Sequence, residues 1–542
     1  MTPRDRRNTL RRALAATLWL CCTTAVTAPA RAADSPLPAA AAEALQRAAI
    51  PADALGVVVL PVAPARWRSG PRLDRQPDRP MQPGSAMKLV TAIVALDRLG
   101  PNVRGFTELL TRAPQQGEVL AGDLVLRGGA DPELGLPQLW AMLAELRHGL
   151  GIREIAGDIV IDRQLFRPAR PDLGAPPFDE QPEFPYNTIP DALNLAGSAV
   201  PVELSSQDPA RPGEVAARTV PALPGLVIDA GSMRPTERAC RDWARDWLSP
   251  PRVDEPAPGV LRVALQGGFP NDCTVRLPLQ LIDRTALAER QLRWLWQGLG
   301  GQWQGRAREA DAPLIPAVEP AASPSALPGA ALLAPGVAWA GDPPATPAGV
   351  RVLARHLARP WGEVLRPLNK QSDNPLTRLL YLQLGLAGMA AEPDTPTAAL
   401  AARAVQRWFV DHDIAGAGLV IENGSGLSRS ERITPRQLAL MLKAAHAGRW
   451  APELLASLPV AGVDGTMRNR LKTGPAAGMA RMKTGTLRNV AALAGYVADP
   501  QGRVYALAAM INHEQAQAGR PALDALVDWV ARGGMSLPGR RP

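Results

Sequence analysis

The sequence predicts an α+β protein, an antiparallel sheet covered by helices and interrupted by large inserted domains. Two apolar runs, 490–497 and 504–511, are joined by a short Asp-Pro-Gln-Gly turn, which predicts a β-meander near the C-terminus. An apolar run at 55–60 predicts the first strand of a five-stranded sheet, and the pattern at 522–530 predicts a helix covering it. A chain of 542 residues allows two to four domains, so a long stretch remains for inserts.

The N-terminal segment, residues 1–32, has the pattern of a secretory signal peptide. A basic start precedes an apolar stretch at 13–28, and Ala30-Arg31-Ala32 offers an A-x-A cleavage site before Ala33. The alternative is a membrane anchor, but the apolar stretch is short for a span, which needs about 20 residues. We therefore expect periplasmic localisation and at most peripheral association with the membrane.

Ser85 and Lys88 form an S-x-x-K pair where a Pro-Gly turn enters an apolar helical run at 89–96. Positions i and i+3 share one face of a helix, so Lys88 can reach back to Ser85. A buried lysine has a lowered pKa and can act as a neutral base for a serine nucleophile. Free N–H groups at a helix N-terminus suit a developing oxyanion. Taken alone, the pair can also be an N-cap serine and a solvated lysine.

Ser372, Asp373 and Asn374 form a polar turn before a second apolar helix. One interpretation makes Asp373 or Asn374 a helix cap. The functional interpretation gives the Ser372 hydroxyl a role in passing a proton to the leaving group. The Asn374 amide then holds the substrate backbone.

Lys-Thr-Gly occurs twice, at 472–474 and 483–485. Only the second copy leads into a predicted strand, where Gly485 would let a substrate strand approach closely. The first copy runs into Pro475-Ala-Ala-Gly, which predicts a loop, so we assign no site to it. In order, the three motifs supply the groups of an acyl-transfer serine enzyme that needs no histidine.

The motifs and their flanks resemble the penicillin-recognising serine enzymes, and specifically the low-molecular-mass class C penicillin-binding proteins, which are D-alanyl-D-alanine carboxypeptidases and endopeptidases. The resemblance implies a penicillin-binding/β-lactamase-like transpeptidase fold. It also implies an enzyme that cleaves peptidoglycan stem peptides and cross-links through an acyl-enzyme, and that β-lactams inhibit by acylating the same serine. The segments that carry the resemblance are 81–91, 369–374, 422–429, 458–466, 483–487 and 493–497.

The resemblance implies catalytic roles for Ser85 as nucleophile, Lys88 as its base and Ser372 as a donor to the departing D-alanine. It adds Asn374 and Lys483 to the catalytic set.

The resemblance also implies that the third motif makes most of the substrate contacts. Lys483 and Thr484 would attract the terminal carboxylate, Gly485 would lie beside the substrate, and the N–H groups of Ser85 and Thr486 would form the oxyanion hole.

The wide spacing of the first two motifs predicts a split catalytic domain, 33–107 and 346–542, around inserted domains at 108–345. A compact β-lactamase would have a short helical segment there. The Pro- and Ala-rich stretch at 310–349 predicts a linker at the return.

Two other classes remain open. A β-lactamase-type hydrolase would use the same motifs but deacylate penicillin fast, and the large insert argues against it. Class A β-lactamases also use an extra glutamate, but Glu422 lies in a peptidase-like Glu-Asn-Gly-Ser-Gly context. A non-catalytic cell-wall scaffold would have no need to keep Ser85 and Lys88.

The charge and composition argue against a nucleic-acid partner. The formal net charge is +9, but the leader carries six arginines and one aspartate, so its removal leaves +4. The other basic residues do not alternate with aromatics, and we expect no nucleic-acid partner. The sequence leaves the oligomeric state open.

The histidines and cysteines do not form the motif of a metal site or of a histidine-dependent hydrolase. None of the five histidines lies in H-E-x-x-H, and the chain has no G-x-S-x-G elbow, so we expect no metal and no cofactor. Of four cysteines, two belong to the leader. Cys240 and Cys273 remain, and in an exported chain such a pair favours a disulfide over two buried free thiols.

Overall fold

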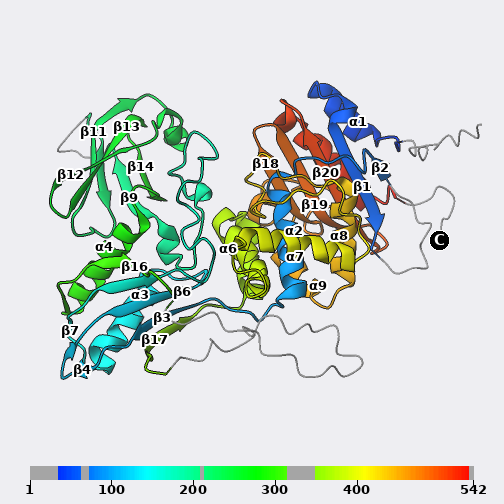
Figure 1. Ribbon diagram of the computed structural model, residues 1–542. Coiled ribbons are helices and arrows are strands. Elements are labelled where there is room, and N and C mark those ends of the chain that lie inside the picture. Colours follow the sequence, from blue (N-terminus) through cyan, green and yellow to red (C-terminus); the bar gives the residue numbers. More distant parts are fainter. Residues whose placement is uncertain (1–33, 63–72, 208–212, 314–347, 536–542) are drawn as a thin grey trace, which may run out of the picture.

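Two lobes make up the protein (Figure 1), a computed structural model that describes residues 34–62, 73–207, 213–313 and 348–535. The predicted signal peptide at 1–32 and most of the predicted linker at 310–349 lie outside the described residues. Within these ranges, no helix is both long and apolar enough to cross a membrane.

The first lobe is built on the predicted five-stranded antiparallel sheet, in the order β18-β19-β20-β1-β2. The meander of β19 and β20 pairs Val490 with Asn512 at one end, and β20 continues the sheet to β1. Among the described strands, β18 pairs with β19 and forms one edge of the sheet, where its Arg481 also makes a single bridge to Val460. The strands are β1 (Leu55–Pro61), β2 (Leu73–Arg75), β18 (Arg481–Leu487), β19 (Val490–Ala498) and β20 (Val504–Asn512).

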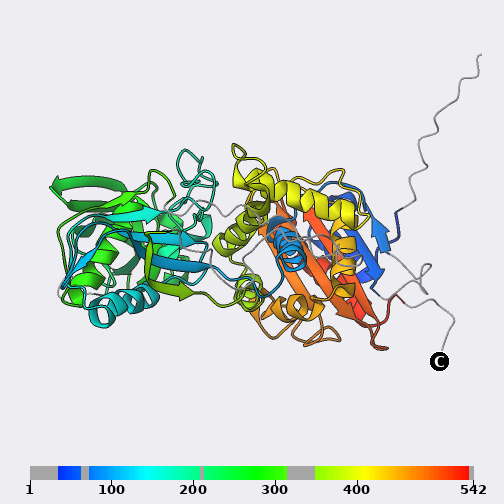
Figure 2. The same cartoon turned by 60° about the horizontal axis from the view of Figure 1, so that its bottom comes forward.

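Each face of this sheet has its own core, because successive strand side chains point to opposite faces. In β1, Val57 and Val59 pack with α1 (Ala39–Arg47) and the predicted C-terminal helix α10 (Arg520–Ala531). Val58 and Leu60 pack with helices on the opposite face of the sheet (Figure 2). These helices are α2 (Lys88–Arg98), α5 (Trp361–Gln371), α6 (Asn374–Gly385), α7 (Thr397–Asp411), α8 (Pro435–Ala447) and α9 (Ala451–Ser457).

The second lobe contains a five-stranded mixed sheet with the order β16-β8-β6-β3-β17. Helices α3 (Leu136–Ala144) and α4 (Arg284–Gly298) contribute to the core of this sheet. The strands are β3 (Phe106–Thr111), β6 (Leu124–Gly129), β8 (Ile159–Asp162), β16 (Ala307–Glu309) and β17 (Arg351–Leu357). A small sheet continues this region with β4 (Gln115–Gln116), β5 (Val119–Leu120), β7 (Glu154–Ile155) and β15 (Gln302–Trp303).

Two three-stranded sheets form the far part of the second lobe. A disulfide joins Cys240 to Cys273 there, and Cys273 is fully buried among the apolar side chains of this core. The strands are β9 (Val200–Ser205), β10 (Ala216–Thr219) and β14 (Thr274–Leu279) in one sheet, and β11 (Leu226–Thr236), β12 (Arg252–Ala257) and β13 (Val260–Pro270) in the other.

In the described part of the chain, the two connections between the lobes lie side by side. The Ala358 N–H donates to the Gly105 carbonyl at 3.0 Å, directly before β3 and after β17. Because β17 pairs with β3, the second lobe extends past the predicted return at 346. We therefore use "first lobe" for the described residues before 105 and after 357, and "second lobe" for the described residues between.

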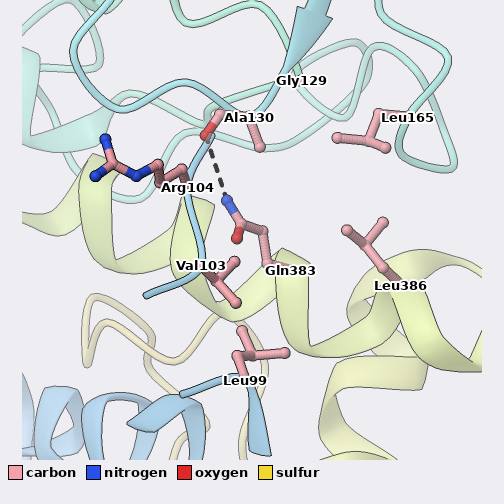
Figure 3. A pocket seen from close by; sticks show the side chains of 8 residues that line it. All are labelled: Leu99, Val103, Arg104, Gly129, Ala130, Leu165, Gln383 and Leu386. Atoms are coloured by element: carbon pink, nitrogen blue, oxygen red, sulfur yellow. Dashed lines mark hydrogen bonds between the residues drawn. The ribbon is translucent and has the colours of Figure 1, made fainter. Parts of the chain in front are cut away.

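Helix α6 is the first-lobe element that lies toward the second lobe (Figure 1). At its C-terminal end, Gln383 Nε2 donates to the Ala130 carbonyl at 3.3 Å (Figure 3). Gln383 Oε1 accepts from Trp361 Nε1 at 3.0 Å. The cavity beside Gln383 is only about 10 Å³, so the lobes are closely packed at this junction.

Candidate active site

Ser85 lies in a short 3₁₀ turn, Gly84–Met87, that continues directly into α2 at Lys88. Lys88 Nζ lies 3.1 Å from Ser85 Oγ, as the i,i+3 spacing predicts. Lys88 is fully buried, while Ser85 is partly exposed and open to a ligand. A Cβ on Gly84, whose φ is +51°, would lie 3.0 Å from the Thr486 backbone nitrogen. The serine-bearing turn therefore packs directly on β18.

Lys88 is held by a carbonyl and an amide as well as by the serine. Its Nζ donates to Asn374 Oδ1 and to the Ser425 carbonyl, both at 2.5 Å. Burial lowers the pKa of Lys88 well below its usual value, and the nearby Lys483 lowers it further. The amine is therefore poised to be neutral and to accept a proton.

The second motif is the turn between α5 and α6. Ser372 ends α5 with a left-handed φ of +61°, and the Asp373 carboxylate caps α6 by accepting from the Leu376 N–H at 2.8 Å. Asp373 is thus the helix cap of the alternative interpretation. Asn374 is not a cap: its Nδ2 donates to the Tyr186 carbonyl of the second lobe at 3.0 Å. One hydrogen of this amide is thus bound by the second lobe, and the predicted contact of Asn374 with a substrate backbone stays a prediction.

The copy of Lys-Thr-Gly at 483–485 lies on β18 beside these groups. Lys483 Nζ donates to Ser372 Oγ at 2.8 Å and to the Thr484 carbonyl at 2.9 Å. Burial lowers the pKa of Lys483 to about 7. Thr484 Oγ1 lies 2.9 Å from Thr466 Oγ1, and Thr486 is exposed two residues further along the strand.

Gly485 is required by packing inside the protein. A Cβ there would come within 2.1 Å of the Pro83 carbonyl, so the glycine lets the serine-bearing turn approach β18. This internal packing is a reason for the glycine that the sequence did not reveal, and the predicted room for a substrate strand stays a prediction. The other copy, 472–474, lies in an exposed loop, as predicted.

Glu431 was not singled out from the sequence, although it shapes the site. Its carboxylate accepts the backbone N–H groups of Glu422, Asn423, Gly424 and Gly426 at 2.9–3.0 Å. These bonds hold the loop whose Ser425 carbonyl contacts Lys88. Burial raises the pKa of Glu431, and the four N–H groups oppose that rise. The Glu-Asn-Gly-Ser-Gly pattern predicted the loop, but it did not identify Glu431 as the acid whose hydrogen bonds hold the loop in place.

The second lobe also borders the site, through a loop that carries Tyr186. Arg378 of α6 is buried and donates to the carbonyls of Asn187 and Thr188 at 3.0 and 2.9 Å. A cavity of about 980 Å³ lies between this loop, α6 and the segment 422–429. Such a volume is in the range of small-molecule and peptide sites. No group of three or more His, Cys, Asp and Glu in the described part of the chain is placed to hold a metal ion.

The matching family model and two relatives of this chain are described as D-alanyl-D-alanine carboxypeptidases. The model of the D-Ala-D-Ala carboxypeptidase 3 (S13) family matches residues 37–334 and 319–533. The D-alanyl-D-alanine carboxypeptidase of Actinomadura sp. strain R39 is 30% identical over 460 residues, 83% of this chain and 76% of the relative. D-alanyl-D-alanine carboxypeptidase DacB of Haemophilus influenzae is 25% identical over 441 residues, 80% of each chain.

A solved structure supports the fold. The crystal structure of penicillin binding protein 4 (dacB) from Haemophilus influenzae superimposes with a TM-score of 0.67 at 21% identity, and the match covers 90% of this chain and 99% of that one. The predicted penicillin-binding fold is thus confirmed.

Proposed function

The chain belongs to the D-Ala-D-Ala carboxypeptidase 3 (S13) family, and from this membership we propose that Ser85 carries the acyl group during hydrolysis of peptidoglycan stem peptides. Membership confirms the predicted serine-type D-Ala-D-Ala carboxypeptidase activity. The observation that supports Ser85 is its 3.1 Å contact with Lys88, a fully buried lysine whose pKa is lowered.

Acylation begins at Ser85. Neutral Lys88 takes the hydroxyl proton while Oγ bonds to the carbonyl carbon between the two terminal D-alanines. The N–H groups of Ser85 and Thr486 stabilise the negative charge that develops on the carbonyl oxygen. The C–N bond then breaks, and Ser372 gives its proton to the departing amine while protonated Lys483 reprotonates Ser372.

Deacylation reverses these roles. Water attacks the ester carbonyl and loses a proton through Ser372 to Lys483, which is neutral after acylation. Lys88, now charged, returns a proton to Ser85 Oγ as the ester bond breaks. A pKa of about 7 suits Lys483 to give and take a proton near neutral pH. Penicillin would acylate Ser85 in the same way and leave slowly.

The cavity between the lobes offers room for more of a stem peptide than its two terminal residues. Its volume is about 980 Å³, and it is lined by Arg378 and Arg429 but by no residue of the three motifs. We infer that the longer part of a stem peptide lies there and that the enzyme also acts as an endopeptidase. Export through the signal peptide at 1–32 would bring the protein to this substrate in the periplasm.

A labelling experiment tests the assignment of the nucleophile. Ser85→Ala should abolish covalent labelling by a fluorescent penicillin and the release of D-alanine from a D-Ala-D-Ala peptide. The variant deletes one small hydroxyl and should stay folded. Ser205→Ala, in the second lobe, is the matched control and should label normally. A folded Ser85→Ala protein that still labels would place the nucleophile elsewhere. Fast release of the label by the wild type would favour a β-lactamase, and no labelling would favour a scaffold.

A further inference from the structure

Arg520, the first residue of α10, reaches the third motif from outside it. Its Nη2 donates to Thr486 Oγ1 at 3.2 Å. The segment before α10 is held against the end of β18, because Gln517 Nε2 donates to the carbonyls of Leu487 and Val490 at 2.7 and 2.8 Å. The guanidinium is therefore placed beside the residue whose N–H faces the serine-bearing turn.

Arg520 has a carboxylate nearby but no ion pair. Within the described ranges no carboxylate lies at ion-pair distance from Arg520, and the nearby Asp524 is bound by Arg470 at 2.7 Å. Burial lowers the pKa of Arg520, and Arg470 lowers it further, while Asp524 raises it. The first turn of a helix also favours negative charge over positive charge. An exposed cation kept in such a place is well suited to an anion from outside the protein.

Lys483, the cation that the sequence predicts for the substrate carboxylate, fits that task less well. It is fully buried, its pKa is about 7, and its Nζ donates to Ser372 and to the Thr484 carbonyl. A guanidinium stays charged at any physiological pH and binds carboxylates through two parallel hydrogen bonds. Thr484 and Thr486 lie two residues apart on β18, so their hydroxyls point to the same side of the strand.

We propose that Arg520, together with the hydroxyls of Thr484 and Thr486, binds the free carboxylate of the terminal D-alanine. Arg520 thereby makes the enzyme prefer substrates with an ionised carboxylate over their neutral esters and amides. The proposal rests on the proposed function, since its ligand is the substrate of that function. One N–H of the guanidinium contacts Thr486, and no other hydrogen bond to a described residue occupies the guanidinium, so its other N–H groups can bind the carboxylate.

The test pairs a change in the protein with a change in the ligand. The second-order rate constant for acylation of Ser85 is measured with benzylpenicillin and with its neutral methyl ester. Arg520→Ala and Arg520→Gln should lower the rate with the acid by about tenfold to a hundredfold. The rate with the ester should not change, so the acid-to-ester ratio falls. The ratio in the wild type should also fall with added salt.

Arg532→Ala is the matched control, because it removes an exposed cation from the other end of α10 and should keep the wild-type ratio. The ratio is internal to each preparation, so it holds even for a variant that folds incompletely. An equal loss with acid and ester, or no loss with either, would overturn the role of Arg520. Labelling that persists in Ser85→Ala would instead overturn the proposed function.

Discussion

The two lobes contribute to the site in different ways. The first lobe carries all three motifs, and its groups make contacts that their residue types and spacing predict, such as Lys88 with Ser85. The second lobe carries no motif, yet the Tyr186 carbonyl bonds to Asn374, and two neighbouring carbonyls bond to Arg378. Residue type thus determines the chemistry, while a lobe without catalytic residues helps to position it.

The largest effect on acylation should come from within the first lobe. Lys483→Ala removes the partner of Ser372 and should cost about 3 kcal/mol in kcat/KM, roughly a hundredfold. Lys472→Ala changes the same motif in an exposed loop and should have little effect, as steady-state kinetics on a D-Ala-D-Ala peptide can show. Equal losses, or a larger one at Lys472, would reverse the assignment of the two copies.

A smaller loss should follow when the contact between the lobes is cut. Arg378→Ala leaves the carbonyls of Asn187 and Thr188 without their donor, at a cost of about 1–3 kcal/mol in stability. The Tyr186 loop then loosens from Asn374, and the rate of penicillin acylation should fall by about tenfold.

Arg403→Ala, an exposed cation on α7, is the control for this variant and should change neither quantity. A lower melting temperature with an unchanged acylation rate would mean that the second lobe stabilises the first without positioning its catalytic groups.

The smallest effect on acylation is expected from the disulfide of the second lobe. Reducing the Cys240–Cys273 bond frees a loop in the unfolded chain and should cost roughly 3–4 kcal/mol of stability in the chain-entropy model. The bond lies far from Ser85 in the sequence, so acylation should persist below the lowered melting transition. Mass spectrometry of unreduced, alkylated protein checks the bond, and two alkylated thiols would contradict it.

The sequence predicted what depends on residue type and local pattern. The order of the motifs led to Ser85, Lys88 and Lys483, and continuous apolar runs bounded by turns led to the five-stranded sheet. The roles of Glu431 and Tyr186 could not be read in this way, because each follows from contacts made only after the chain has folded. Tyr186 and Asn374 are 188 positions apart. An acid among serines and arginines, like Glu431, looks solvated in a sequence.

At Gly485 the sequence predicted a close contact but not the partner in that contact. A glycine in a strand predicts a close approach by some backbone, and the structure contains such an approach. The partner is the Pro83 carbonyl of the same chain. The residue type thus predicted a close backbone approach at this position, but it did not identify the segment that makes the approach.

The adjacent crossing points at Gly105 and Ala358 bear on how the protein could be shortened or recombined. A hydrogen bond of 3.0 Å joins them, so a short connector could replace the whole second lobe without stretching the chain. Such a minimal protein would expose Arg378, now buried, and the amide of Asn374 to solvent. A transplant of the second lobe into another host would therefore need a recipient helix with matching donors, so the interface, more than the connection, limits modular exchange.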